Sequence, residues 1–214
     1  MQRRRWIGFA AALGVLLAAY APPGARALTL ADLAGGGGFS AGALSFADFQ
    51  VSIAGDLSPD LTDYAVQVLA DGFRLTGPLS ALLGGTGTLL LSYDVTAAGP
   101  VIDGASLFAP GTTIGAGALT WVGESVFAPG DVPIASLFVF DIEGVGSDPS
   151  DAASFAPQSA ISVAKSVQVG GGSFAVIPVL DQRFSLVPEP WSLLMVSSGL
   201  LGLALWSQRH ERMT

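Results

Sequence analysis

Residues 64–76 read YAVQVLADGFRLT. Apolar and polar residues alternate on both sides of Asp71 and Gly72, and a period of two is typical of half-buried β-strands. An Asp-Gly pair between two such runs favours a two-residue type I′ turn, because that turn needs residues that tolerate positive φ. The stretch therefore predicts a β-hairpin and indicates the fold class of the segments around it.

The same alternation recurs on both sides of this hairpin, in runs separated by Gly, Pro and Asp. About nine short strands at such regular spacing predict an all-β, antiparallel β-sandwich or jelly-roll-like domain. No amphipathic helix is indicated, although PLSALL at 78–83 is expected to hold one helical turn before Gly84 and Gly85. The other predicted strands are 44–53, 89–96, 105–108, 118–127, 134–142, 160–169 and 173–186.

The composition of this central part excludes several kinds of chemistry. Residues 28–187 hold fifteen Asp and Glu against Arg74, Lys165 and Arg183, a net charge of −12 beside −8 for the whole chain. Such a surface repels phosphate, so no nucleic-acid partner is expected. The chain has no Cys and one His, His210, near the C-terminus, which leaves no structural zinc, disulfide, thiolate or His-based triad in the central part. No cofactor or metal is predicted.

Residues 1–27 have the order of a secretory signal peptide. Three arginines at 3–5 precede the apolar run 7–21, and a Pro-Pro-Gly break leads to the small residues Ala25 and Ala27. Cleavage is expected after Ala27, since about 15 apolar residues are few for an uncleaved membrane anchor. The arginines fit the general and the twin-arginine export routes equally well, so the route stays open.

Residues 188–214 combine three features in a fixed order: a Pro-Glu-Pro motif, the uncharged run WSLLMVSSGLLGLALW at 191–206, and a basic terminus. As a helix the run is about 24 Å long, close to the ~30 Å hydrocarbon core, and flanking Arg side chains can snorkel. It has no polar face, which favours a transmembrane helix over a buried helix of the domain. The motif is Pro188, Glu189 and Pro190, and the helix flanks are Trp191, Trp206, Arg209 and Arg212.

This tail resembles the PEP-CTERM sorting signal of exported proteins from exopolysaccharide-producing bacteria. The resemblance covers residues 188–214 and departs from the pattern mildly where Glu211 interrupts the basic cluster. It implies exosortase, a membrane-embedded cysteine peptidase-like transpeptidase, as the partner that processes the chain near Pro188–Pro190. Residues 151–187 are also similar to the run that precedes the tail in many such proteins, but no activity attaches to that run.

Three features of the central part carry candidate chemistry. Ser162 and Lys165 match the S-x-x-K spacing of penicillin-binding enzymes, but in a strand residues three apart point to opposite faces, so Lys165 is expected to face solvent on an edge strand. Trp121 is expected to fill the core, a sugar-stacking platform being the alternative. The acids Asp141, Glu143, Asp148 and Asp151 suit either a calcium loop or, as we expect, solvated turns.

Two functions follow from these observations. The first is an exported, non-enzymatic cell-envelope or extracellular-matrix protein with a signal peptide (1–27), a β-sandwich (28–187) and a PEP-CTERM tail (188–214). The export machinery delivers it, the tail holds it transiently in the inner, cytoplasmic membrane, and processing sends it to the cell surface or outside the cell. The second is a secreted carbohydrate-binding or carbohydrate-active module with extracellular polysaccharide as partner; a carboxylate pair for glycoside hydrolysis stays open, because sequence spacing does not reveal one.

Overall fold

The computed structural model describes residues 28–187, in which every strand pair is antiparallel. Long strands dominate, and the helical elements are short. In chain order the elements are β1 (Leu28–Thr29), α1 (Leu30–Ala34), β2 (Phe39–Ala41), β3 (Leu44–Gly55), the 3-10 helix η1 (Leu61–Asp63), β4 (Ala65–Val68), β5 (Gly72–Thr76), β6 (Ser80–Leu82), β7 (Thr86–Ala97), β8 (Val101–Phe108), β9 (Thr112–Ile114), β10 (Leu119–Ala128), β11 (Val132–Ile142), β12 (Gly146–Asp148), β13 (Ser150–Gln158), β14 (Ala160–Gly170), β15 (Phe174–Val176) and β16 (Leu180–Val187).

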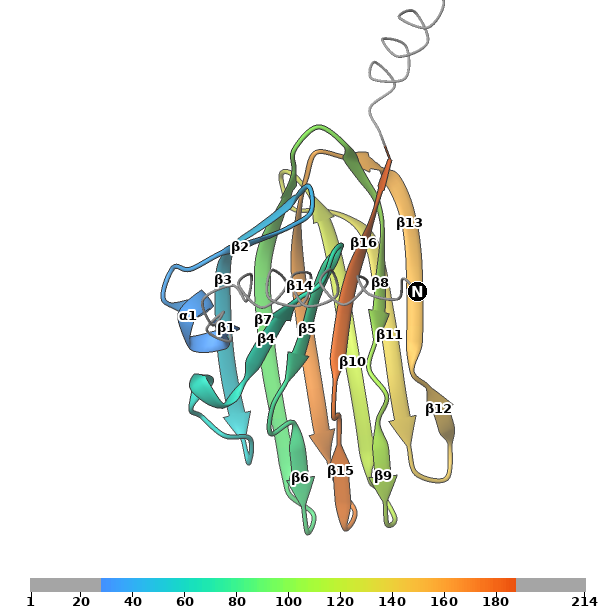
Figure 1. The fold of residues 1–214 in the computed structure, drawn as a ribbon. Coiled ribbons are helices and arrows are strands. Elements are labelled where there is room, and N and C mark those ends of the chain that lie inside the picture. Colours follow the sequence, from blue (N-terminus) through green and yellow to red (C-terminus); the bar gives the residue numbers. More distant parts are fainter. Residues whose placement is uncertain (1–27, 188–214) are drawn as a thin grey trace, which may run out of the picture.

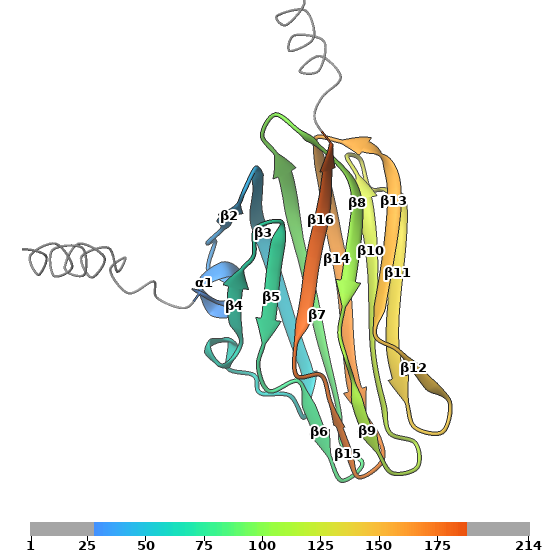
Figure 2. The ribbon, with the colours of Figure 1, turned by 45° about the vertical axis from the view of Figure 1, so that its right-hand side comes forward.

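Within residues 28–187 these strands form two large sheets and one small sheet. The six-stranded sheet has the order β1-β4-β5-β16-β8-β13, and the seven-stranded sheet has the order β12-β11-β10-β14-β7-β3-β2. The two large sheets pack face to face, which confirms the predicted all-β antiparallel sandwich (Figure 1, Figure 2). The small sheet, β6-β15-β9, lies at the end of the sandwich opposite to Val187, the last residue of β16 (Figure 1).

The core lies between the large sheets and follows the period of two along each strand. In β14, Val163 and Val167 are completely buried, whereas the intervening Ala164 is exposed. A cluster of aromatic rings fills the centre, with Phe73 of one sheet edge-on to Tyr93 of the other at 5.4 Å between centroids. Such burial contributes about 1.5–3 kcal/mol for each large apolar side chain, so the domain has a sufficient core without disulfides.

A hydrogen bond from a side chain connects the two large sheets along one edge of the sandwich. β12 pairs only with residues 140–142 of β11, so the Phe138 N–H has no backbone partner on β12. The Asp151 carboxylate on β13 accepts a hydrogen bond from this N–H at 2.8 Å. Because β11 and β13 belong to different sheets, this bond joins the two sheets along one edge.

Several sequence-based expectations need correction. The hairpin predicted at 64–76 is confirmed as β4 and β5. The predicted type I′ turn at Asp71 and Gly72 is wrong, because neither residue has a positive φ and the Leu69 N–H donates to the Gly72 carbonyl. Residues 80–82 form a strand paired with β15, not a helical turn. The strand expected at 173–186 is two strands, β15 and β16. The sequence interpretation also missed α1 and β13, although Thr29 and Asp32 form a capping box for that helix.

The predicted signal peptide (1–27) and sorting tail (188–214) lie outside the described residues. With them lie the predicted cleavage residues Ala25 and Ala27 and all residues of the Pro-Glu-Pro motif and its predicted transmembrane helix. In the part that is described, residues 28–187, no helix is long and apolar enough to cross a membrane.

Candidate functional site

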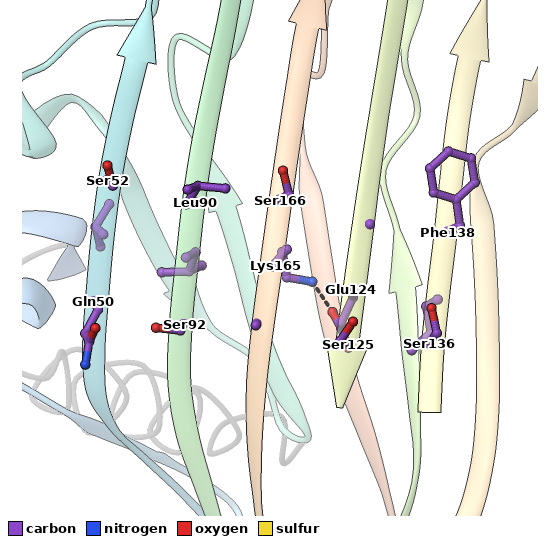
Figure 3. Close-up of a pocket in the computed structure, with 15 residues that line it drawn as sticks. Gln50, Ser52, Leu90, Ser92, Glu124, Ser125, Ser136, Phe138, Lys165 and Ser166 are labelled. Carbon is purple, nitrogen blue, oxygen red and sulfur yellow. Dashed lines mark hydrogen bonds and ion pairs between the residues drawn. The ribbon is translucent and has the colours of Figure 1, made fainter. Parts of the chain in front are cut away.

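A groove of about 700 Å³ crosses the outer face of the seven-stranded sheet (Figure 3). Five consecutive strands, β3, β7, β14, β10 and β11, form its floor, each with residues at matching register positions. At about 4.8 Å between strands, the floor is about 19 Å wide. The outward residues that line it are Gln50, Ser52, Leu90, Ser92, Gly123, Ser125, Ser136, Phe138, Ala164 and Ser166.

The outward side chains of this groove are neutral. Five are serines and one is Gln50, so the floor offers hydroxyl and amide groups that both donate and accept hydrogen bonds. Leu90 and Phe138 add apolar surface, and each residue is 49% exposed. Neutral hydrogen-bonding groups beside exposed apolar groups suit a ligand that carries hydroxyls on an apolar ring face.

An aromatic strip continues from the groove along β10 and β11. The Trp121 ring lies 5.9 Å from the Phe138 ring, and Phe138 stacks with Phe140 at 5.8 Å. Trp121 is half-buried on the outer face, so the prediction that it fills the core is wrong. Gly123 leaves room for it, because a Cβ at that position would lie 3.3 Å from the Trp121 ring.

A polar cluster lies on the core side of the same strands. Lys165, the only lysine of the chain, has a completely buried side chain that forms an ion pair with the equally buried Glu124 (Figure 3). Its Nζ also donates to Gln182 Oε1 at 2.6 Å, and Gln182 Nε2 donates to Glu124 Oε1 at 3.1 Å. The prediction that Lys165 faces solvent on an edge strand is therefore wrong: β14 is the central strand of its sheet.

Burial governs the protonation of this cluster. Desolvation lowers the pKa of Lys165 below its ordinary value, even though the neighbouring Glu124 carboxylate opposes the change. Tyr93 is also completely buried, and desolvation together with the Glu124 charge raises its pKa well above the ordinary value. The Tyr93 hydroxyl has no hydrogen-bond partner among residues 28–187.

The S-x-x-K residues lie on opposite faces, as a strand requires. The Ser162 hydroxyl points outward and donates to Asp94 at 2.7 Å, whereas Lys165 points into the core. The two side chains therefore do not meet as nucleophile and base.

The acidic loop residues do not gather either. Asp141 accepts from the Thr113 hydroxyl at 3.1 Å, while Asp151 binds the Phe138 N–H. Within the described part of the chain, no group of three or more His, Cys, Asp or Glu side chains could hold a metal ion.

A second hollow, of about 510 Å³, lies on the outer face of the six-stranded sheet. Its charged groups have partners: Arg74 Nε and Nη2 donate to the two oxygens of Asp181 at 2.6 and 2.8 Å, and Arg183 pairs with Asp71. The Asp181 carboxylate raises the pKa of Arg74. These pairs satisfy one another and leave little free hydrogen-bonding capacity for a ligand.

Sequence reasoning missed Glu124, Gln182 and Phe138. One signal was available for Glu124, because it stands in phase with Val122 and Val126, two residues to either side on β10, and all three are buried. The proximity of Gln182 had no local signal, since its partners lie 17 and 58 residues away along the chain.

No protein-family model and no curated protein matches this chain. Among solved structures, TmCBM61 in complex with β-1,4-galactotriose covers 63% of this chain and 88% of its own at 12% identity, with a TM-score of 0.33. A CBM4 structure covers 66% and 86% at 11% identity (TM-score 0.32). The carbohydrate-binding module CBM6cm-2 from Cellvibrio mixtus lichenase 5A in complex with cellotriose covers 64% and 90% at 12% identity (TM-score 0.27). Similarity this weak says nothing of what this chain binds.

Proposed function

We propose that the β-sandwich is a non-enzymatic module that binds an extended, neutral polysaccharide in the groove of the seven-stranded sheet. The observation that carries the proposal is the groove itself: a five-strand floor of serines and Gln50 with Trp121 and Phe138 at one side. Sugar hydroxyls pair with such neutral polar groups, and the apolar face of a pyranose ring stacks on an aromatic side chain.

The charges of the groove favour binding over hydrolysis. Glycoside hydrolysis needs two carboxyl groups that reach the scissile bond from the ligand side. Of the described residues that line the groove, Glu124 is the one carboxylate, and its side chain points into the core, where Lys165 and Gln182 occupy it. We therefore expect the groove to bind a polysaccharide without cleaving it.

Binding is tested with the mature protein and a panel of neutral polysaccharides, measured by affinity electrophoresis and calorimetry. We expect one or more of them to be retained, and Trp121→Ala to weaken that binding by about tenfold or more, since buried aromatic contacts dominate such interfaces. Absence of binding across the panel, or equal binding by Trp121→Ala, refutes the groove proposal. Release of reducing ends would refute the non-enzymatic part.

We also propose that this module reaches the cell envelope or extracellular matrix through its two termini. The ordered Pro-Glu-Pro motif, apolar run and basic terminus at 188–214 support processing by exosortase, and residues 1–27 support export with cleavage after Ala27. Proline disfavours helical backbone at its own position and the one before it, so we expect the Pro188–Pro190 motif to be the part of the tail that the peptidase processes.

Sorting is tested in a host that carries exosortase. Leu200→Arg should release unprocessed protein, because an Arg in the centre of the apolar run costs about 2.5–3.5 kcal/mol on insertion scales. Glu189→Ala should remain in the membrane uncleaved. Fractionation with intact-mass analysis separates these products, and N-terminal sequencing should begin at Leu28. Normal processing of both variants would leave the tail as a plain anchor.

A further inference from the structure

We propose that Lys165 and Gln182 become joined by an intramolecular isopeptide bond, with Glu124 as the proton carrier. The three side chains meet in the centre of the sandwich, where Lys165 and Gln182 lie on the central strands of opposite sheets. The side chains of Lys165 and Glu124 have no exposed surface, and Gln182 is likewise fully buried. This modification is independent of the groove and of sorting.

The hydrogen bonds place the carboxylate between the two reacting groups. One oxygen of Glu124 contacts Lys165 Nζ, and the other accepts from Gln182 Nε2 at 3.1 Å. Lys165 Nζ in turn lies 2.6 Å from Gln182 Oε1, beside the amide carbon that it must attack. Glu124 therefore reaches both the nitrogen that loses protons and the nitrogen that leaves, as a general acid-base group must.

Burial prepares the nucleophile. A lysine attacks a carbonyl only as the neutral amine, and desolvation lowers the pKa of Lys165 toward that form. Transfer of one proton from the Lys165 ammonium to Glu124 gives a neutral amine and a neutral carboxyl group without solvent. The reactive state thus needs only a shift of a proton along an existing hydrogen bond.

The reaction balances without an oxidant or a co-reactant. Lys165 Nζ forms a bond to Gln182 Cδ, and the Cδ–Nε2 bond breaks after Nε2 has received a proton through Glu124. Ammonia leaves, and its third hydrogen comes from Lys165. The starting ammonium, carboxylate and amide become an amide, a protonated Glu124 and ammonia, so both buried charges disappear. Removal of an ion pair from a low-dielectric core favours the products.

Tyr93 supplies a further donor beside this cluster. Its hydroxyl is completely buried and has no partner among the described residues, and Tyr93 stands on the core face of β7 opposite Val163, two residues from Lys165 along β14. In the tetrahedral intermediate negative charge develops on Gln182 Oε1, and a donor held in a dry site stabilises such charge. We therefore expect Tyr93→Phe to slow bond formation without preventing it.

Trypsin digestion with mass spectrometry tests the bond on the folded full-length chain. Between residues 28 and 187 trypsin can cut only after Arg74, Lys165 and Arg183. The isopeptide blocks the cut at Lys165, so we expect the peptide 75–183 intact and lighter by about 17 Da, the mass of ammonia. Fragmentation should give no backbone ions between 165 and 182. Separate peptides 75–165 and 166–183 from protein held folded for days would overturn the proposal.

Amine labelling gives an independent readout. Lys165 is the only lysine, so the unfolded chain has two primary amines, the N-terminus and Nζ. After denaturation an acylating reagent should label wild-type protein once and Gln182→Met twice. The Gln182→Met variant keeps the ion pair with Glu124 and is the matched control. Glu124→Gln should also label twice, because it cannot carry the proton; if it fails to fold, wild type and Gln182→Met still decide the question. A loss of about 18 Da with a link to Glu124 would refute Gln182 as the acyl donor.

Discussion

Phe138 and Phe108 are exposed to similar degrees, 49% and 42%, on the outer faces of opposite sheets. Of the two, only Phe138 lines the groove and contacts Trp121. Comparing variants of the two residues therefore distinguishes specific binding in the groove from non-specific binding to exposed apolar surface. We expect Phe138→Ala to weaken polysaccharide binding by about tenfold, and Phe108→Ala to leave it unchanged within about twofold. Calorimetry on both variants measures this, and equal losses would indicate non-specific adsorption.

At the same scale, single residues explain where sequence reasoning fails. On β10 both faces carry bulky residues: Val122, Glu124 and Val126 on one side, Trp121 and Phe127 on the other. Alternation predicts the strand correctly, but it does not say which face is buried. A lone Lys between valines also looks like a surface residue, because the carboxylate that pairs with Lys165 is 41 residues away in sequence. Which side chains meet in the groove and in the core cluster depends on how the strands pair in the sheets, and the local sequence pattern does not encode that pairing.

Among the elements, long alternating strands were predictable and short or polar ones were not. β3, β7, β10, β11 and β14 lie within a few residues of their predicted ranges, because each is a long run rich in apolar residues, interrupted in β10 and β14 only by the buried polar residues Thr120, Glu124 and Lys165. β13 was missed since its apolar row is short, with Ala153 and Phe155 packed against the core, and it is held by pairing with β8. Residues 80–82 likewise form a strand because β15 is there to pair with them.

The edge between β11 and β13 gives a prediction about stability. The Asp151 carboxylate accepts one hydrogen bond from the Phe138 N–H and one from the N–H of Ala152, the next residue in the chain, each at 2.8 Å. Asp151→Ala leaves the Phe138 N–H without this acceptor, and we expect the free energy of unfolding to fall by about 1–3 kcal/mol. Asp151→Asn keeps a carbonyl acceptor and should lose less. Urea denaturation measures both.

Asp148→Ala on the neighbouring β12 is the matched control, because Asp148 is exposed and its carboxylate makes no hydrogen bond or ion pair with another residue of the range 28–187. We expect a change within about 0.5 kcal/mol. An equal loss in Asp148→Ala and Asp151→Ala would mean that net charge, and not the bond to Phe138, stabilises this edge.

For the whole molecule, the absence of cysteine means that no disulfide joins the two sheets. Arg183 and Asp181 lie on either side of Gln182, and β16 ends at Val187 just before the predicted sorting tail. Any pull transmitted from a membrane-held tail enters the sandwich through β16. A covalent bond from Gln182 to β14 would pass that load to the centre of the other sheet, and would thus give the mechanical benefit of a disulfide without a redox requirement.

The pH dependence of unfolding distinguishes the linked from the unlinked molecule. In Gln182→Met, Lys165 remains an amine whose folded pKa is lowered by burial from its ordinary value of 10.5. Between the folded pKa and 10.5 the unfolded chain then binds more protons than the folded chain, so the free energy of unfolding rises as pH rises through that window. In linked wild type Lys165 is an amide and does not titrate, so this rise should be absent.

Tyr64 and Tyr93 work in the opposite direction, because their raised pKa values make the folded chain bind more protons above pH 10.0, their ordinary value. Both proteins contain both tyrosines, so the tyrosines contribute to both unfolding curves, whereas the rise with pH that Lys165 adds is expected in Gln182→Met alone. Denaturation with guanidinium from neutral pH to about pH 10 measures that difference, with stability in Gln182→Met approaching wild type as pH rises. Parallel curves for the two proteins would show that Lys165 titrates alike in both, and that no bond to Gln182 has formed.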